Sequence, residues 1–500
     1  MAVAVRESTP NPGPSTTAAR DADERERRTR AYGESLLRAL RRQERRGGSD
    51  WLYNRMIGLA TQDEATKVEL FRFVDALPAL KTPEAVSQHL RQYLLRPDIS
   101  LPPGAKGLLA FLERTAPTRR LLAAASHTGA RMMARRFIAG ADAREATGAV
   151  TGLRRRNLGF TLDLLGEAVT SEAEALAYQK RYLDLIRDLS DIAAKWPENP
   201  RTDQAPFGPL PKVNVSVKLS SLYARFDPMA ADATVQAVKE RLRPILSLAR
   251  ERGVFVNVDM EQHDFKGATH RIFREILCEE AYRDWPDVGI VVQAYLRDAE
   301  DDLLSLLGWT KGRGTPVWVR LVKGAYWDYE TIVAAQRGHP VPVFSRKAET
   351  DANYERLTEL LIENWQTLRP AIATHNVRSA ARARAVAEEH GLPPRTVEYQ
   401  VLFGMGEPIG RALAAEGERV RVYVPFGELL PGMAYLVRRL LENTSNDSFI
   451  RSAASAGKAE ELLADPTAAA LAPVPCPGTA LTPGDSRRKG RGAGGEGRIP

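Results

Sequence analysis

The sequence predicts a (β/α)8 barrel of the TIM type preceded by an all-helical arm, and three observations lead to this fold class. Eight short runs of β-branched or apolar residues lie between residues 157 and 452. A helix-like segment follows each run, and the runs are nearly continuous in apolar residues, as in parallel strands buried on both faces. Eight such β-then-α units are the count for a closed barrel.

The predicted strands follow one another along this region. They are residues 158–163, 213–218, 254–259, 289–294, 317–322, 371–375, 397–402 and 420–424, and a last helix is expected over about 428–443. An open doubly wound sheet shows the same alternation, but it more often has a phosphate-binding loop after its first strand. Residues 164–174 contain no such loop, which favours the barrel.

One glycine-rich run imitates a nucleotide-binding motif. GMGEPIG (404–410) follows a predicted strand, but it has one residue too many for the dinucleotide fingerprint. It also follows the seventh strand rather than the first. We interpret it as a tight loop at the mouth of the barrel.

Residues 31–156 show helical periodicity and no strand run, which predicts a helical arm or subdomain. Thr82 can cap a helix and Pro83 suits its first position, after which Val86, Leu90 and Leu94 share one face. The two ends carry few large apolar side chains and cannot offset the entropy of ordering. Residues 1–30 are therefore expected to be a disordered tail, and residues 453–500 to be largely disordered.

The composition is that of an ordinary globular protein, with 43% hydrophobic and 27% charged residues. It excludes fibrous, collagen-like and wholly disordered proteins. Two cysteines exclude a disulfide framework and a cysteine-based zinc cluster. No apolar run approaches the ~20 residues that cross a bilayer, and residues 1–20 lack the apolar core of a secretory signal. We therefore expect a reduced, cytoplasmic protein.

The formal net charge of +8 is a weak excess for this length. Much of it lies in basic runs near the ends, at residues 25–30, 41–46 and 487–491. No aromatic residues interleave with these runs, so no nucleic-acid partner is expected. Weak attraction to an anionic membrane surface stays open.

Polar residues recur where the predicted strands end, which is where TIM barrels carry their functional groups. In strand order they are Lys218; Asp259, Glu261 and His263; Gln293; Arg320 and Lys323, with Tyr326 and Trp327 beyond; His375 and Asn376; Leu402; and Tyr423. Convergence of polar groups at one end of successive strands indicates a binding or catalytic mouth.

Two other chemistries compete for this mouth. Asp259, Glu261 and His263 alternate, so an extended chain would present them on one face as metal ligands, with His375 nearby. A metal-dependent barrel hydrolase is therefore the second hypothesis, although the absence of H-x-H or H-E-x-x-H spacing favours a hydrogen-bonded strand end and no metal. Lys323 could form a Schiff base, but Arg320 close by favours a pair of cations for a large anionic ligand.

The last predicted helix carries an arginine pair. Arg438 and Arg439 are adjacent in the segment 434–443, and Glu442 lies within reach of both. Apolar residues flank the pair on both sides, so neither arginine has a solvent face by pattern. A guanidinium fork held by a carboxylate suits two-point binding of a small carboxylate ligand.

Several segments together resemble the proline dehydrogenase domain of bacterial proline-utilisation proteins. They are VSVKLSSL (215–222), VDMEQ (258–262), VVQAY (291–295), VRLVKGAYW (319–327), SRKAETD (345–351), ATHN (373–376), LFGMGEP (402–408) and YLVRRLLEN (435–443). The resemblance extends over about 157–452 and, less specifically, over the helical region before it. It implies a (β/α)8 barrel that carries FAD without a dinucleotide fingerprint.

The same resemblance implies the site residues. For FAD they are Gln293, Arg320, Lys323, Ala325, Trp327, Arg346, Lys347 and His375, with Arg320 near the reactive edge of the flavin and Lys323, Arg346 and Lys347 along its ribityl chain and pyrophosphate. For proline they are the carboxylate clamp Arg438 and Arg439, the paired charges Glu442 and Lys218, and the pocket residues Asp259, Tyr423, Tyr435 and Leu402. Arg320, Asp259, Lys218 and Tyr423 form the expected catalytic set.

The implied reaction is the oxidation of L-proline to 1-pyrroline-5-carboxylate. A hydride passes from Cδ to flavin N5, and the electrons go on to a membrane quinone. The chain would then act as a peripheral protein at the inner face of the cell membrane. No segment fits the aldehyde dehydrogenase half of bifunctional family members, so a separate glutamate semialdehyde dehydrogenase is expected. A monofunctional enzyme and a shortened bifunctional one both stay open. A non-catalytic protein that keeps the fold is the third hypothesis.

Overall fold

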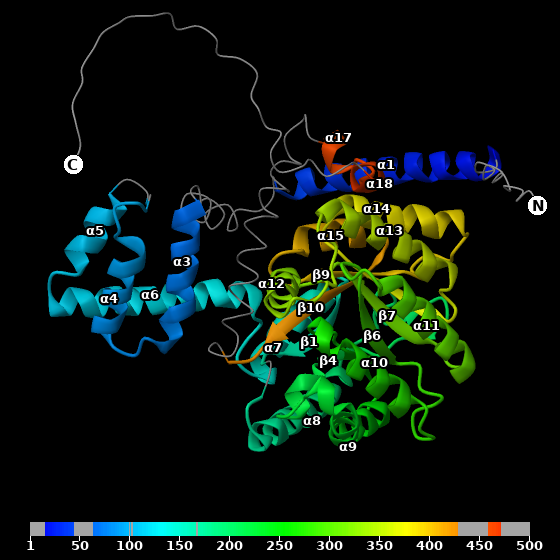
Figure 1. Cartoon of the computed structure of the whole chain (residues 1–500), viewed down its shortest axis with the longest axis horizontal. Helices are drawn as coiled ribbons and strands as arrows, with labels where there is room; N and C mark the ends of the chain where they lie inside the picture. Colours follow the sequence, from blue (N-terminus) through cyan, green and yellow to red (C-terminus); the bar gives the residue numbers. More distant parts are fainter. Residues whose placement is uncertain are drawn as a thin grey trace, which may run out of the picture.

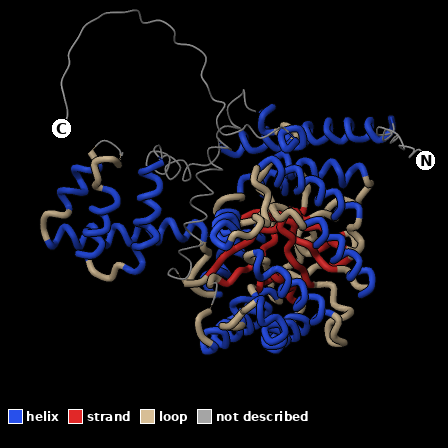
Figure 2. Tube along the Cα trace, in the orientation of Figure 1, coloured by secondary structure: helices blue, strands red, loops and turns tan. Residues whose placement is uncertain are grey.

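The centre of the molecule is a closed barrel of eight parallel strands. The computed structural model describes residues 16–44, 64–99, 101, 104–166, 169–428 and 459–471. The strands follow one another around the barrel in the order β1-β10-β9-β8-β7-β6-β5-β4. Figure 2 shows them in the middle of the larger body, surrounded by helices. The predicted fold class is therefore confirmed.

All eight predicted strands are present, each within a few residues of its expected bounds. They are β1 (Gly159–Leu164), β4 (Val213–Val217), β5 (Val254–Val258), β6 (Val288–Gln293), β7 (Val317–Val322), β8 (Leu368–Ala373), β9 (Glu398–Leu402) and β10 (Arg419–Phe426). The helices between them are α8 (Glu172–Ala193), α9 (Ala231–Glu251), α10 (His263–Leu277), α11 (Ala299–Arg313), α12 (Trp327–Arg337), α13 (Lys347–Glu363), α14 (Val377–Glu389) and α15 (Glu407–Ala415). A small hairpin of β2 (Gln204–Ala205) and β3 (Gly208–Pro209) was not predicted.

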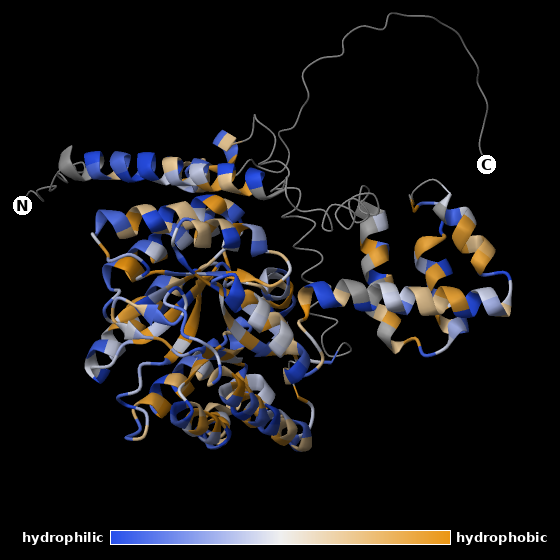
Figure 3. Ribbon diagram, turned by 180° about the vertical axis from the view of Figure 1, so that it is seen from behind, coloured by the Kyte–Doolittle hydropathy of each residue, from blue (hydrophilic) through white to orange (hydrophobic). Residues whose placement is uncertain are grey.

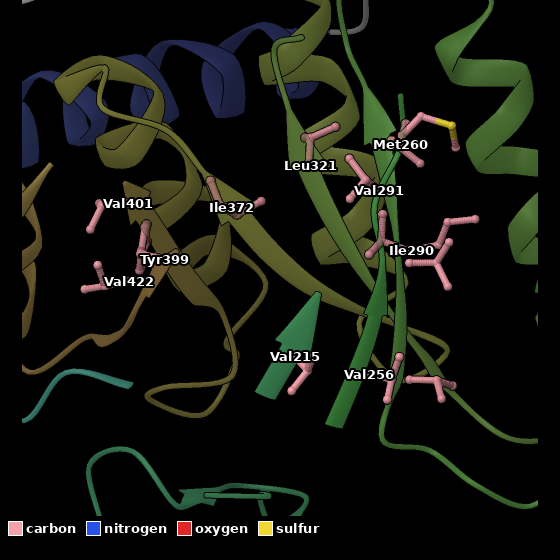
Figure 4. Packing of buried hydrophobic residues seen from close by; sticks show 14 of the residues in the cluster. Val215, Val256, Met260, Ile290, Val291, Leu321, Ile372, Tyr399, Val401 and Val422 are labelled. Atoms are coloured by element: carbon pink, nitrogen blue, oxygen red, sulfur yellow. The ribbon is translucent and has the colours of Figure 1, made fainter. Parts of the chain in front are cut away.

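Side chains along the barrel strands alternate between an apolar outer face and an inner face that carries many polar groups, together with the apolar side chains of Phe255, Trp318 and Ala371. Val215, Val256 and Val422 belong to the main hydrophobic cluster, which also contains residues of the surrounding helices (Figure 4). The residues between them bond across the interior, as Arg320 Nη2 does to Ser216 Oγ at 3.1 Å. TIM barrels commonly fill their interior with branched aliphatic side chains. The prediction of a parallel sheet buried on both faces is confirmed, although polar side chains fill much of the inner face.

The predicted helical arm precedes the barrel and has a core of its own. It contains α3 (Glu64–Ala76), η1 (Leu77–Ala79), α4 (Pro83–Leu94), α5 (Ala105–Leu112), α6 (Ala116–Phe137) and α7 (Ala143–Arg155). Figure 1 shows α3–α5 beside the barrel, with α6 running toward it. Val86, Leu90 and Leu94 are buried in the arm's separate hydrophobic cluster, and Thr82 Oγ1 caps α4 by accepting from Ala85 N at 3.2 Å. Both features confirm the helix predicted there.

The predicted end of the N-terminal tail was wrong, because α1 (Thr16–Glu44) begins well before residue 31. Figure 1 shows α1 lying along α14, and Figure 3 shows that it is mostly hydrophilic. Charged groups hold the first part of α1 in place, while Leu36 and Leu40 in its second part are buried in the main hydrophobic cluster. Glu26 accepts two hydrogen bonds of 2.8 Å from Arg378, and Arg25 Nη1 donates to Glu359 Oε2 at 3.0 Å. Apolar content therefore underestimated its order.

Part of the C-terminal segment is also ordered, which corrects the expected disorder for residues 459–471. The short helices α17 (Ala459–Leu462) and α18 (Pro466–Leu471) lie near α1 and α14 in Figure 1. Leu463 is buried in the main hydrophobic cluster, and its carbonyl oxygen accepts from Arg378 Nη1 at 2.7 Å. Of the helices that the structure describes, none combines the length and apolar character needed to cross a bilayer.

Candidate active site

Arg320 lies at the centre of the polar interior, close to the carboxyl end of β7. Its side chain is 4% exposed. Nε donates to Gln400 Oε1 at 2.7 Å, Nη1 to Asp259 Oδ1 at 2.6 Å, and Nη2 to Ser216 Oγ at 3.1 Å. The acceptors come from β9, from the end of β5 and from β4. Three bonds to three elements fix both the position and the plane of the guanidinium.

Asp259 joins Arg320 to Tyr423, so three of the four expected catalytic residues form one cluster. Tyr423 Oη donates to Asp259 Oδ2 at 2.8 Å, and Asn257 Nδ2 donates to Asp259 Oδ1 at 3.1 Å. The guanidinium carbon of Arg320 lies 5.1 Å from the centre of the Tyr423 ring, within the range of a cation–π interaction. The cation, the carboxylate and the phenol therefore hold one another in a fixed arrangement.

Lys218, the fourth expected catalytic residue, has a partner that the sequence interpretation missed. Its Nζ is paired with the carboxylate of Asp163 in β1, and both side chains are buried. Burial raises the pKa of the Asp163 carboxyl above its usual value, against the pull of Lys218. The signal was a single acid within an otherwise apolar strand. Asp163 thus adds a second buried charge pair to the mouth.

The three alternating residues after β5 do not continue that strand. The strand ends at Val258, so the extended geometry that would place Asp259, Glu261 and His263 on one face is not present. Glu261 Oε2 accepts from Ser220 N at 3.2 Å, and His263 is the first residue of α10. Within the ranges that the structure describes, no three His, Cys, Asp or Glu side chains come together in a way that could hold a metal ion. The expectation that they share one face was wrong.

Gln293, the last residue of β6, offers an acceptor that suits a flavin ring. It is 3% exposed, and its Nε2 donates to Glu261 O at 3.1 Å. Among the residues that the structure describes, none donates to its Oε1. Because buried amide oxygens are normally hydrogen-bonded, this atom fits an N–H group of a bound ligand.

The expected pyrophosphate residues gather where α13 begins. Arg346 is the N-cap residue of α13 and Lys347 its first residue. The amino end of a helix together with two cations is a suitable site for phosphate. Asp351, one turn further on, pairs with both Lys347 and Lys323. Burial lowers the pKa of Lys323, which Asp351 opposes. Arg320 and Lys323 thus have separate carboxylates and face separate parts of the mouth.

The remaining expected cofactor residues lie on loops around the mouth. Ala325 is exposed between β7 and α12, and Trp327 at the start of α12 is 43% exposed while its indole Nε1 donates to Phe344 O at 2.8 Å. An exposed indole face beside a cation-rich helix end suits an adenine ring. Together with Gln293, these residues fit FAD.

His375, which is expected to contact the cofactor, makes a hydrogen bond that joins two strand ends. Its Nε2 accepts from the backbone N of Leu402 at 2.9 Å, which ties the end of β8 to the end of β9.

The glycine-rich run after β9 is a tight turn. A Cβ at Gly406 would lie 2.4 Å from His375 Nε2, and one at Gly404, whose φ is +76°, would lie 2.0 Å from Arg136 O. Glycine is therefore required by close packing at both positions.

The expected proline clamp cannot be described in the same way. Arg438, Arg439, Glu442 and Tyr435 lie outside the described residues. Leu402, the other pocket residue, is half-buried at the end of β9, beside Tyr423 in the strand register. The clamp therefore remains a prediction from the sequence.

Comparison with known proteins places the barrel in a family. A family model described as Proline dehydrogenase matches residues 146–452, more than half of the chain. The chain belongs to the proline dehydrogenase family. A second model, described as the Proline utilization A N-terminal domain, matches residues 26–137. The family assignment agrees with the resemblance seen in the sequence.

Individual relatives show how much of the chain is shared. The proline dehydrogenase 1 of Bacillus subtilis (strain 168) is 30% identical over 322 residues, which cover 64% of this chain and 90% of that protein. The bifunctional protein PutA of Escherichia coli (strain K12) is 32% identical over 350 residues, covering 68% of this chain and 25% of that one.

A solved relative agrees in fold over a longer stretch. The crystal structure of PutA from Bdellovibrio bacteriovorus, inactivated by N-propargylglycine, has a TM-score of 0.81 and 42% identity, and it covers 90% of this chain and 44% of that one. Relative to the curated bifunctional proteins from other organisms, this chain spans about a quarter of their length.

Several polar residues of the proline dehydrogenase barrel were missed by sequence reasoning. Besides Asp163, they are Ser216, Asn257, Glu398 and Gln400, all buried and all hydrogen-bonded inside the barrel. The signal was present as polar residues at alternate positions of apolar strands, such as VNVSV in β4. Reading each strand with a period of two would have identified them.

Proposed function

We propose that this chain oxidises L-proline to 1-pyrroline-5-carboxylate with bound FAD. The observation that carries the proposal is the Arg320 cluster, a buried cation held on three sides near the carboxyl end of a proline dehydrogenase barrel. Fixed positive charge close to the mouth is the element that a hydride transfer to a flavin needs from the protein.

The chemistry sets the tasks of the side chains. FAD, when bound, supplies the acceptor for the hydride that leaves proline Cδ. The nitrogen lone pair forms the C=N bond as the C–H bond breaks, so the amine has to reach the mouth without its extra proton. The protein must also hold Cδ within about 3–3.5 Å of the acceptor. Positioning, exclusion of water and fixed charge are therefore the contributions of the chain.

Each residue has one of these tasks. Arg320 stabilises negative charge that develops beside it, and Asp259 and Tyr423 hold it in place. Arg438 and Arg439 bind the proline carboxylate with Glu442 and Lys218 as the charges around them, while Tyr435 and Leu402 shape the pocket over the ring. Gln293, Lys323, Ala325, Trp327, Arg346, Lys347 and His375 would hold FAD.

The proposed reaction needs an onward electron acceptor and a fate for its product. We propose a membrane quinone as the acceptor, met at the membrane surface by peripheral contact, and a net charge of +8 is compatible with attraction to an anionic surface. The cyclic product opens in water to glutamate semialdehyde, which a separate dehydrogenase would oxidise.

Turnover of the purified chain tests the proposal. The protein is incubated with L-proline and a soluble quinone, and the product is trapped with o-aminobenzaldehyde; D-proline serves as the control substrate. We expect a yellow protein that forms the adduct from L-proline. Flavin-loaded protein that forms none would refute the proposal, and chelator-sensitive hydrolysis would support the metal hypothesis instead.

A further inference from the structure

We propose that Glu398 is a positioning residue for Arg320 and that it acts through the side-chain amide of Gln400. The proposal rests on the proposed function only in taking Arg320 as the arginine beside the flavin. Neither Glu398 nor Gln400 is among the residues expected to bind proline or FAD.

A continuous relay of buried hydrogen bonds joins Arg320, Gln400, Glu398 and Arg421. Arg320 Nε donates to Gln400 Oε1 at 2.7 Å, and Gln400 Nε2 donates to Glu398 Oε1 at 2.7 Å. Arg421 donates to both oxygens of Glu398, through Nε at 2.8 Å and Nη2 at 3.0 Å. The exposed fractions of the four side chains are between 2% and 6%. The relay thus crosses the interior from β10 through β9 to β7.

The order of donors and acceptors along the relay gives it a direction. An ionised carboxylate can only accept hydrogen bonds, so the NH2 group of Gln400 must face Glu398. The carbonyl oxygen of Gln400 is then forced toward Arg320, which can only donate. A guanidinium or a carboxylate has no such ambiguity, but an amide can be turned end for end. Glu398 and Arg320 therefore require the same orientation of the Gln400 amide, one from each side, and Glu398 supplies the acceptor for its NH2 group.

The charge on Glu398 is secured from the side away from Arg320. Burial works against its ionised form, but Arg421 and Arg419 hold the pKa of Glu398 below its usual value. Arg421 is anchored in turn, because its Nη1 donates to Phe160 O at 2.8 Å. The carboxylate therefore stays an acceptor across the physiological pH range.

A turned amide would disturb Arg320 without unfolding the barrel. Its NH2 group would face Arg320 Nε–H, donor against donor, and one of the bonds that fix the guanidinium plane would be lost. A narrow cavity lies alongside, lined by Arg320, Glu398, Gln400 and Arg421 together with Asn257 and Asn214. That space of about 10 Å³ adjoins both the amide and the guanidinium. Loss of the carboxylate at position 398 should consequently let Arg320 shift.

The test uses isosteric substitutions in the flavin-loaded full chain. Glu398→Gln removes the carboxylate that orients the amide. The double variant Glu398→Gln/Gln400→Glu restores the direction, because position 400 then accepts from both Arg320 and the amide at position 398, whose oxygen accepts from Arg421. Gln400→Met removes the acceptor for Arg320 and leaves the Glu398–Arg421 pair intact, which covers the case in which Glu398→Gln fails to fold.

A matched control separates positioning from general loss of stability. Asp203→Asn makes the same acid-to-amide change in another buried pair, in which Arg154 Nη1 and Nη2 bind the two carboxylate oxygens at 2.8 Å each. That pair makes no contact with the relay described above. Asp203→Asn should lower the melting temperature without altering the reduction potential of the flavin.

Two quantities are measured: the reduction potential of the bound flavin, by dye-mediated titration without proline, and the rate of flavin reduction at saturating proline. We expect Glu398→Gln and Gln400→Met to disfavour reduced flavin about tenfold, a negative shift of about 30 mV for a two-electron couple, and to slow reduction about tenfold. The double variant should recover to within about threefold of wild type, and Asp203→Asn should match wild type.

Three results would overturn the inference. They are wild-type potentials and rates in both Glu398→Gln and Gln400→Met, failure of the double variant to recover, and the same shift in Asp203→Asn. If the wild-type flavin is not reduced by proline but the potentials behave as expected, the proposed function fails while the inference holds.

Discussion

Replacing Arg320 by methionine removes the guanidinium while keeping an unbranched side chain of similar length. The structure lets the effect be divided into two parts. Asp259 keeps its bonds from Tyr423 Oη and Asn257 Nδ2 but loses its cation. Breaking one side of a buried charge pair costs roughly 3–5 kcal/mol of folding stability. For the reaction, loss of one fixed donor of this kind typically slows the chemical step about 10²–10³-fold.

Rapid mixing with saturating proline under anaerobic conditions measures the second part. We expect flavin reduction to slow by about 10²–10³-fold, while the proline concentration that gives half the limiting rate changes far less, because the carboxylate clamp is elsewhere. The double variant Arg320→Met/Asp259→Asn is the control. It should regain most of the melting temperature, since no unpaired charge is left buried, but not the rate.

A reduction rate for Arg320→Met within about threefold of wild type would refute the reasoning, because a fixed cation beside the reacting group should contribute far more than that to the rate. Equal recovery of stability and rate in the double variant would also refute it, because the arginine would then act only through folding.

Three further predictions follow from other residues. Arg439→Met should raise the KM for proline by about 10–100-fold with flavin still bound, as expected for one charge-assisted bond to a ligand; an unchanged KM in steady-state assays contradicts the clamp. Burial, with Arg274 and Lys266 nearby, lowers the pKa of His270 to about 4, so the unfolded chain binds a proton that the folded chain refuses. Denaturant titrations should show stability falling by up to about 3 kcal/mol as pH drops from 6.5 toward 4, and His270→Phe should abolish that share of the loss. Asp163→Asn should destabilise by roughly 3 kcal/mol because it leaves Lys218 buried without its partner, and an unchanged melting temperature would contradict the pairing.

The strands and helix starts could be predicted because their signals are local. Thr82 followed by Pro83 marks the start of a helix, and most barrel strands are short runs of β-branched or apolar residues. The polar ends of the strands were also identified correctly as a group, since parallel strands bring their carboxyl ends to one edge.

The pairings inside the site could not be predicted because they join residues far apart in sequence. Lys218 pairs with Asp163, 55 positions away, and Glu26 binds Arg378 across 352 positions. Spacing rules reach only a few residues, so the pairing of Lys218 with Asp163 and the ordered part of the N-terminal helix were missed. Glu261 and His263 were misplaced for a different reason, because the strand ends one residue before Asp259.

In the proposed reaction, proline delivers its electrons to a flavin held over the Arg320 cluster. The most direct measurement is the visible absorbance of the purified chain after L-proline is added without oxygen. We predict that the yellow flavin band bleaches with L-proline and persists with D-proline. A flavin-loaded protein whose band is unchanged by L-proline would show that proline does not reduce this flavin.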